Sequence, residues 1–181
     1  MLLDTPICEF GWKGPEFTLN DPDGTAFTMS DHLTDKGLLI MFICNHCPYV
    51  KAVADRLASD AKLLMDEGIG VLAVMSNDYR QKPADSPENM KLFAAEHGFP
   101  FPYLVDEDQS VGKAYGAVCT PDFFGFNKDG GLQYRGRLDS AGMNDPEGRA
   151  PELVNAMRQI AETGEGPREQ HPSMGCSIKW S

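Results

Sequence analysis

The chain has 181 residues, of which 16 are lysine or arginine and 27 are aspartate or glutamate, for a net charge of −11. This balance excludes a general affinity for nucleic acid or anionic membranes, because both would repel the protein. The length is that of one domain whose core needs no metal or disulfide. The longest apolar run, Leu38 to Cys44, is too short to cross a bilayer, so we expect no membrane partner.

The first half of the chain predicts a hairpin followed by a strand–helix–strand unit. Alternating apolar residues around turn residues predict the hairpin over Glu16 to Met29. The continuous apolar run from Leu38 to Cys44 is typical of a strand buried on both faces. A helix from Pro48 to Gly68 is predicted by apolar residues three or four apart, namely Val50, Val53, Ala54, Leu57, Ala61 and Leu64. Ile69 to Met75 predicts a second buried strand.

The second half predicts further helices and strands and a polar tail. In chain order these are a helix (87–97), a strand (103–105), a short helix (111–115), an antiparallel hairpin (122–126 with 132–134) and an amphipathic helix (152–161). The order predicts an α/β fold with a central mixed sheet flanked by helices on both faces. We expect one domain over residues 1–162 and an extended tail over residues 163–181 that packs on or near it.

Two cysteines lie where the first buried strand meets its helix, in the run Cys44-Asn45-His46-Cys47-Pro48. Ligands of α/β sheets bind beyond the carboxyl ends of the strands, which is where these two cysteines lie. The amides and dipole at a helix N-terminus favour a thiolate, which is the attacking species in disulfide exchange. The pattern predicts a thiol-disulfide oxidoreductase in which Cys44 is the nucleophile and Cys47 the resolving thiol. His46 is predicted to tune the redox balance by stabilising the reduced form.

The remaining cysteines leave alternatives open. The five cysteines form an odd set, and only two of them have motif spacing. The N-terminus lacks the basic start and apolar stretch of a secretory signal, so we expect a cytoplasmic protein, where structural disulfides are rare. A working dithiol without cofactor or metal is the favoured interpretation. The alternative is a zinc- or copper-binding module that uses Cys44 and Cys47 with Cys119, His46 or Cys176.

Nearly the whole chain resembles the alkyl hydroperoxide reductase and thiol-specific antioxidant family, a peroxiredoxin-like group of thioredoxin-fold redoxins. The segments that carry the resemblance are Pro15 to Leu19 with Asp23-Gly24, Phe42 to Val50, Cys119 to Phe124 and Gly175 to Trp180. The resemblance implies a thioredoxin-like fold with an N-terminal β-hairpin. It also implies that Pro121 is a cis-proline facing the dithiol and contacting substrate, and that the backbone of Thr120 pairs with a substrate strand.

The sequence also departs from that family. The dithiol encloses Asn-His, unlike the Gly-Pro of thioredoxin, so a general disulfide-reductase activity does not follow. Peroxiredoxins carry Thr or Ser three residues before the peroxide-reactive cysteine. In this sequence the residue three positions before Cys44 is Met41, and the residue three positions before Cys47 is Cys44. Thiol-dependent peroxide reduction, with a sulfenic acid on Cys44 resolved by Cys47, is therefore the alternative activity.

The expected partners follow from this chemistry. They are a protein or small molecule that carries a disulfide or thiol, and a dithiol reductant as electron donor. Cys119, beside Pro121, is either a third redox thiol or a small buried apolar residue. Cys176 is an additional resolving thiol, a site of intermolecular bridging or part of a packed tail. Arg137 is interpreted as a solvated side chain at a strand end.

Overall fold

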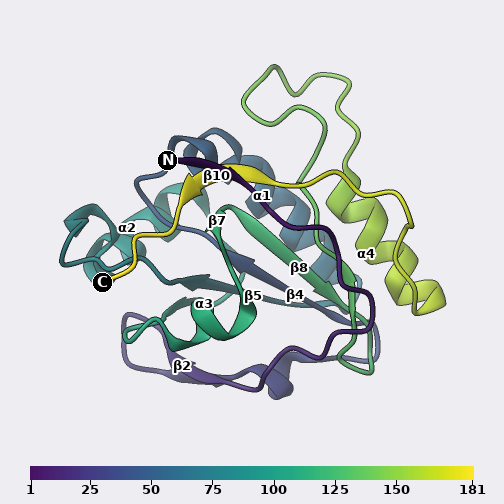
Figure 1. Cartoon of the computed structure of the whole chain (residues 1–181), viewed down its shortest axis with the longest axis horizontal. Helices are drawn as coiled ribbons and strands as arrows, with labels where there is room; N and C mark the ends of the chain where they lie inside the picture. The colour runs from purple at the N-terminus through teal and green to yellow at the C-terminus, as the bar shows by residue number, and fades with distance from the viewer.

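A seven-stranded mixed sheet forms the centre of the computed structural model, which describes all 181 residues (Figure 1). The strand order is β3-β2-β6-β5-β4-β8-β9. The bounds are β2 Thr18–Asn20, β3 Ala26–Thr28, β4 Leu38–Phe42, β5 Gly70–Met75, β6 Tyr103–Val105, β8 Asp122–Phe126 and β9 Leu132–Tyr134. Strands β4, β5 and β6 run parallel, while β8 is antiparallel to β4. The structure confirms the predicted mixed sheet and its helices.

Helices cover both faces of this sheet because the side chains of its buried strands alternate between two cores. Helices α1 (Pro48–Asp66), α2 (Pro87–His97) and α4 (Glu152–Thr163) pack on one face, where Leu39 and Met41 of β4 point. Helix α3 (Ser110–Tyr115) and the N-terminal segment cover the other, where Leu38, Ile40 and Phe42 point. Two 3₁₀ turns, Met29–His32 and Pro83–Asp85, complete the regular structure. None of the helices combines the length and apolar character needed to span a membrane.

A second, three-stranded sheet joins the two ends of the chain and was not predicted. It consists of β1 (Leu2–Asp4), β10 (Met174–Ser177) and β7 (Cys119–Thr120), with β10 in the middle. Figure 1 shows β10 beside the N-terminus, above the start of α1. The pairing joins residues from opposite ends of the chain, such as Leu2 with Cys176, so no hairpin turn marks it in the sequence. The proposed boundary at residue 162 stays a prediction, although the tail does pack on the domain.

Candidate active site

The first turn of α1 places the two cysteines at the end of β4. The helix begins at Pro48, whose missing N–H costs nothing in the first turn, and Cys47 is its N-cap residue. Cys44 lies three residues earlier, just beyond the last residue of β4. Both cysteines are almost fully buried, with 1% and 0% of their surface exposed. The dithiol is therefore covered in this structure.

Thr120 contacts both sulfur atoms from the opposite side. Its Oγ1 lies 3.3 Å from Cys44 Sγ, and its backbone oxygen lies 3.4 Å from Cys47 Sγ, which donates to it when protonated. The Thr120–Pro121 peptide bond is cis. The structure thus brings four of the predicted site residues together, whereas the predicted contacts of Thr120 and Pro121 with substrate stay predictions.

The two sulfurs differ in their affinity for a proton. A hydrogen bond from the Cys44 thiol is the largest cause that lowers the pKa of Cys47 to about 4. Burial opposes this shift, while Thr120 and the backbones of Cys176 and Val50 add to it. The pKa of Cys44 is raised well above its ordinary value, first by its hydrogen bond to Cys47 and then by burial. The directions of the two shifts therefore favour a negative charge on Cys47 over one on Cys44.

This charge distribution bears on the predicted division of roles. The amides of the first helical turn were expected to favour a thiolate at Cys44. Cys47 is instead the N-cap residue, so the positive end of the helix dipole lies at Cys47, although its side chain makes no cap hydrogen bond. The assignment of Cys44 as nucleophile and Cys47 as resolving thiol stays a prediction, but the lowered pKa of Cys47 and the raised pKa of Cys44 favour the reverse order.

A buried carboxylate that sequence reasoning missed holds the turn between the cysteines. Asp85 accepts hydrogen bonds from the backbone N–H groups of Asn45 (2.7 Å) and His46 (3.1 Å), and from the amide of Asn77 (3.0 Å). The His46 ring also pairs with Asp85 through Nδ1. The only signal in the sequence was the polar segment that follows β5. Because β4 and β5 are parallel neighbours, the segments that follow them lie at the same edge of the sheet, and this segment could have been expected near the cysteines.

Replacement of this carboxylate is expected to destabilise the protein in a pH-dependent way. Burial raises the pKa of Asp85, but hydrogen bonds from His46, Asn77 and Asn45 outweigh it, so the net shift is downward. The ionised Asp85 side chain thus stabilises the folded protein above about pH 4, and this stabilisation is lost as the pH falls through the lowered pKa of Asp85. We expect Asp85→Asn to lower the free energy of unfolding at neutral pH by about 1–3 kcal/mol.

Urea denaturation at neutral and at acidic pH measures this effect. The difference between Asp85→Asn and the wild type should narrow as the pH falls. The control is Asp35→Asn, which changes an exposed carboxylate and should leave stability nearly unchanged at both pH values. An equal loss for Asp85→Asn at both pH values would contradict the assigned hydrogen-bond role.

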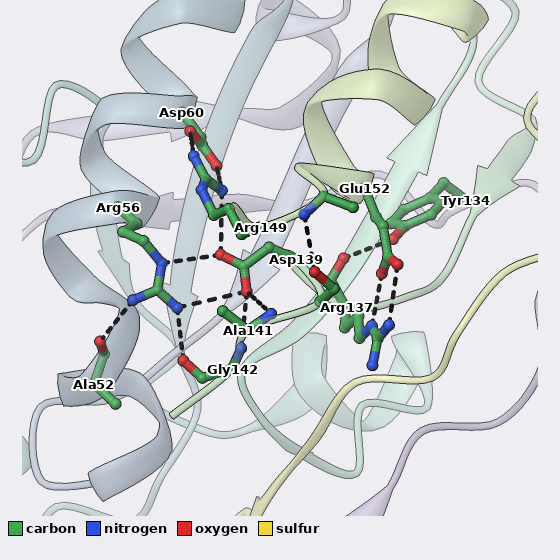
Figure 2. A network of polar contacts seen from close by, with 12 residues as sticks. Ala52, Arg56, Asp60, Tyr134, Arg137, Asp139, Ala141, Gly142, Arg149 and Glu152 are labelled. Atoms are coloured by element: carbon green, nitrogen blue, oxygen red, sulfur yellow. Dashed lines mark hydrogen bonds and ion pairs between the residues drawn. The ribbon is translucent and has the colours of Figure 1, made fainter. Parts of the chain in front are cut away.

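A cavity of about 290 Å³ opens beside the dithiol, between the first turns of α1 and the loop before α4. Tyr49, Pro121 and Phe123 form its inner wall, and Met174 of β10 also lines it. Arg137 contributes to the lining, but its guanidinium is held by Glu152 at 2.6 and 3.0 Å (Figure 2). This ion pair replaces the solvated strand-end position expected for Arg137.

A network of ion pairs fixes the outer wall of this cavity to α1 (Figure 2). The fully buried side chain of Asp139 accepts hydrogen bonds from Arg56 (2.9 Å) and Arg149 (3.1 Å). Arg149 also makes two 2.7 Å contacts with Asp60 of α1. Because these pairs are largely withdrawn from water, they are screened less than surface pairs and hold the loop in place.

The other cysteines occupy different surroundings. Cys119 is fully buried, and burial raises its pKa to about 12, with Asp122 adding to the effect. These surroundings favour a buried apolar role, and a redox role for Cys119 stays a prediction. Cys8 is half-buried, and burial raises its pKa to about 11. Cys176 lies in β10 and packs against the core that contains both cysteines of the dithiol.

One group of side chains has the chemistry of a metal site. The ligand atoms of Cys44, His46 and Asp85 all lie within 4.8 Å of one another. The Asp85 oxygens, however, already accept four hydrogen bonds, two of them from the backbone N–H groups of Asn45 and His46. Metal coordination would have to displace some of these bonds, so the donor set fits a structural clamp better than a metal centre.

Comparison with known proteins decides the family. The model of the AhpC/TSA family matches residues 10–135, which include the dithiol, Thr120 and Pro121. The chain belongs to the AhpC/TSA family. This confirms the predicted resemblance to the alkyl hydroperoxide reductase and thiol-specific antioxidant proteins.

Individual known proteins resemble the chain to different degrees. The thiol-disulfide oxidoreductase ResA of Bacillus subtilis is 28% identical over 66% of this chain, and the match spans 63% of ResA. An uncharacterized conserved protein of Geobacillus kaustophilus is 43% identical, with a TM-score of 0.93, covering 100% of this chain and 97% of that one. The thioredoxin domain of an oxidoreductase from Bacteroides vulgatus has a TM-score of 0.65 at 17% identity, covering 84% of this chain and 97% of that one, which confirms the thioredoxin-like fold.

Proposed function

We propose that this AhpC/TSA protein is a thiol-disulfide oxidoreductase whose working pair is Cys44 and Cys47. The observation that carries the proposal is the adjacent pair of sulfurs at the start of α1, one of them with its pKa lowered to about 4. A ready thiolate beside a protonated partner is the arrangement that disulfide exchange requires. The relationship to ResA supports the same reaction class.

In the proposed reaction the Cys47 thiolate attacks a substrate disulfide. One substrate sulfur bonds to Cys47 and the other leaves as a thiolate. Cys44 then loses its proton and attacks Cys47 Sγ, which forms the Cys44–Cys47 disulfide and releases the second substrate thiolate. Two electrons pass from the protein to the substrate, and an external dithiol restores the reduced pair. A protein or small molecule with an accessible disulfide is the proposed substrate, and its flanking groups would occupy the cavity beside Pro121.

His46 and the cellular location stay proposals in this scheme. His46 was expected to act directly on the thiolate, but its ring is held by Asp85. We therefore propose that His46 tunes the redox balance by fixing the turn between the cysteines, because its ring and its backbone N–H both bind the Asp85 carboxylate. A cytoplasmic location remains a prediction from the sequence.

Redox equilibration with reduced and oxidised dithiothreitol, followed by alkylation and mass spectrometry, tests the oxidoreductase proposal. We expect a two-electron transition that forms a Cys44–Cys47 bond, and this bond should be absent from Cys44→Ser and Cys47→Ser. Cys8→Ser is the control and should leave the transition unchanged, because Cys8 lies outside the site. An oxidised wild-type protein without a Cys44–Cys47 bond would exclude this function.

Peroxide reduction is the second candidate, favoured by the AhpC/TSA family and by the charged sulfur at the N-cap of α1. The Cys47 thiolate would attack a peroxide oxygen and become a sulfenic acid as the second oxygen leaves as water or alcohol. Cys44 would then form the disulfide and release water. Loss of thiols on mixing reduced protein with hydrogen peroxide would support this activity, and thiols that persist through prolonged exposure would exclude it.

A further inference from the structure

The C-terminal strand occupies the edge at which a substrate strand was expected to pair. Strand β10 runs antiparallel to β7, with Cys176 opposite Thr120 and Ser177 opposite Cys119. The backbone N–H of Ile178 donates to the oxygen of Val118 at 3.2 Å and extends this pairing. An extended peptide that adds to a strand edge makes the same kind of backbone contact. The chain thus fills its own strand-binding edge beside the dithiol.

Close packing and side-chain contacts on either side of Cys176 define this position. Gly175 passes so near Thr120 that a β-carbon added there would lie 1.8 Å from the Thr120 backbone oxygen. Ser173 Oγ donates to the oxygen of Pro121 at 2.7 Å. Beyond the strand, the N–H of Lys179 donates to Asn77 Oδ1 at 2.7 Å. Glycine at position 175 is therefore required for β10 to lie directly on the loop that contacts both sulfurs.

The strand also brings a third thiol to the pair. Cys176 is partly buried and packs against the core that contains Cys44 and Cys47. Burial and the nearby Cys47 thiol raise the pKa of Cys176, while the Cys176 backbone contributes to the lowered pKa of Cys47. Cys176 pairs with Thr120, and Thr120 contacts the sulfurs of both Cys44 and Cys47, so the three cysteines meet at one residue.

We propose that Cys176 is a third redox thiol and that β10 acts as an internal substrate strand, an inference that rests on the proposed function of the dithiol. In the oxidised protein, Cys176 loses its proton and attacks Cys47 Sγ. The Cys47–Cys176 bond forms, the Cys44–Cys47 bond breaks, and Cys44 leaves as a thiolate that takes up a proton. No electrons leave the protein, because the disulfide only changes partners.

This exchange has a consequence for external substrates. Cys47 is fully covered in this structure, and β10 lies over the edge that a substrate strand would use. An external disulfide must displace β10 to reach Cys47, so the internal strand and the substrate compete for one place. Moving the disulfide to Cys176 places it on a strand near the surface, where a reductant can reach it.

Disulfide mapping of Cys44→Ser tests the proposal directly. The reduced variant is treated with diamide, which accepts the two electrons, then alkylated, digested without reductant and analysed by mass spectrometry. We expect an intramolecular Cys47–Cys176 bond in most molecules and in the matched variant that also carries Cys8→Ser. The bond should be absent from Cys44→Ser/Cys176→Ser. Free thiols at Cys47 and Cys176, or bonds formed only between molecules, would overturn the proposal.

The wild-type protein provides a measurement that does not depend on folding of the variant. In partly oxidised wild type we expect the Cys47–Cys176 link beside the Cys44–Cys47 link, and its absence at every degree of oxidation would also overturn the proposal. A missing Cys44–Cys47 link would instead count against the proposed function, so the two failures are distinguishable.

A second, independent test displaces β10. Gly175→Ala places a β-carbon against Thr120 and should lift β10 from the edge, which should increase alkylation of Cys47 by iodoacetamide at least tenfold. The matched control is Gly131→Ala, whose added β-carbon would meet its nearest neighbour at an ordinary 3.5 Å. An alkylation rate of Cys47 that is the same in both variants would show that β10 does not cover this sulfur.

Discussion

The ultraviolet absorbance of thiolates in the reduced protein should persist down to about pH 5 and disappear with a midpoint near pH 4. The reason is that the pKa of Cys47 is lowered to about 4, chiefly by the hydrogen bond from Cys44. An ordinary cysteine, with a pKa of about 8.5, would lose the same absorbance roughly four pH units higher. An acid titration of the reduced chain followed by absorbance measures the effect.

Three variants assign the signal to its sulfur. Cys47→Ser should remove the absorbance at neutral pH, whereas Cys8→Ser should leave it unchanged. Cys44→Ala removes the thiol that donates to Cys47, so the midpoint should move upward toward the ordinary range. A signal that survives Cys47→Ser and disappears in Cys44→Ala would restore the assignment of Cys44 as the charged nucleophile.

The location of the charge also determines which variant accumulates an intermediate. If Cys47 attacks first, Cys44→Ser should trap a mixed disulfide between Cys47 and the substrate, unless Cys176 resolves it. The double variant Cys44→Ser/Cys176→Ser is therefore expected to trap the mixed disulfide most completely. The lowered pKa of one sulfur and the raised pKa of the other define this order, because the protonated thiol must ionise before it can attack.

The largest loss of stability is expected from Arg135→Met. The side chain of Asp122, at the start of β8, is completely buried and receives hydrogen bonds from Arg135 at 2.8 and 3.2 Å. Burial raises the pKa of Asp122, and Arg135 opposes that shift. Removing Arg135 leaves a buried carboxylate without its cation, which costs about 3–5 kcal/mol. Urea denaturation at neutral pH measures the change in the free energy of unfolding.

Two controls separate the loss of the ion pair from other effects of the substitution. Arg135→Met/Asp122→Leu removes both charges and should recover much of the lost stability, because a buried pair can be replaced by apolar residues at little cost. Arg80→Met breaks the exposed pair with Glu107 and should cost no more than about 1 kcal/mol. Equal losses for Arg135→Met and Arg80→Met would contradict the importance of burial.

The sequence was sufficient to predict those elements whose residue pattern is local. The apolar run over β4 and the three- and four-residue spacing along α1 predicted both elements, because burial of a strand or helix leaves a period in the chain. The cysteines that separate these elements were identified for the same reason, since their position followed from the elements on either side. The matched family model confirmed the resemblance carried by the segments around Cys44 and Pro121.

What the sequence by itself determined, then, is the α/β fold, the family and the location of the dithiol. Only the tertiary structure showed that Asp85 holds the turn between the cysteines, that β10 lies on Thr120, and that Cys47 has the lower pKa. The first two features depend on contacts between groups distant in the chain, which leave no period in the sequence. The pKa difference depends on how the thiols of Cys44 and Cys47 are oriented toward each other, which their spacing does not specify. The dithiol motif identifies two sulfurs, but the surrounding hydrogen bonds determine which one is charged and which third sulfur lies beside it.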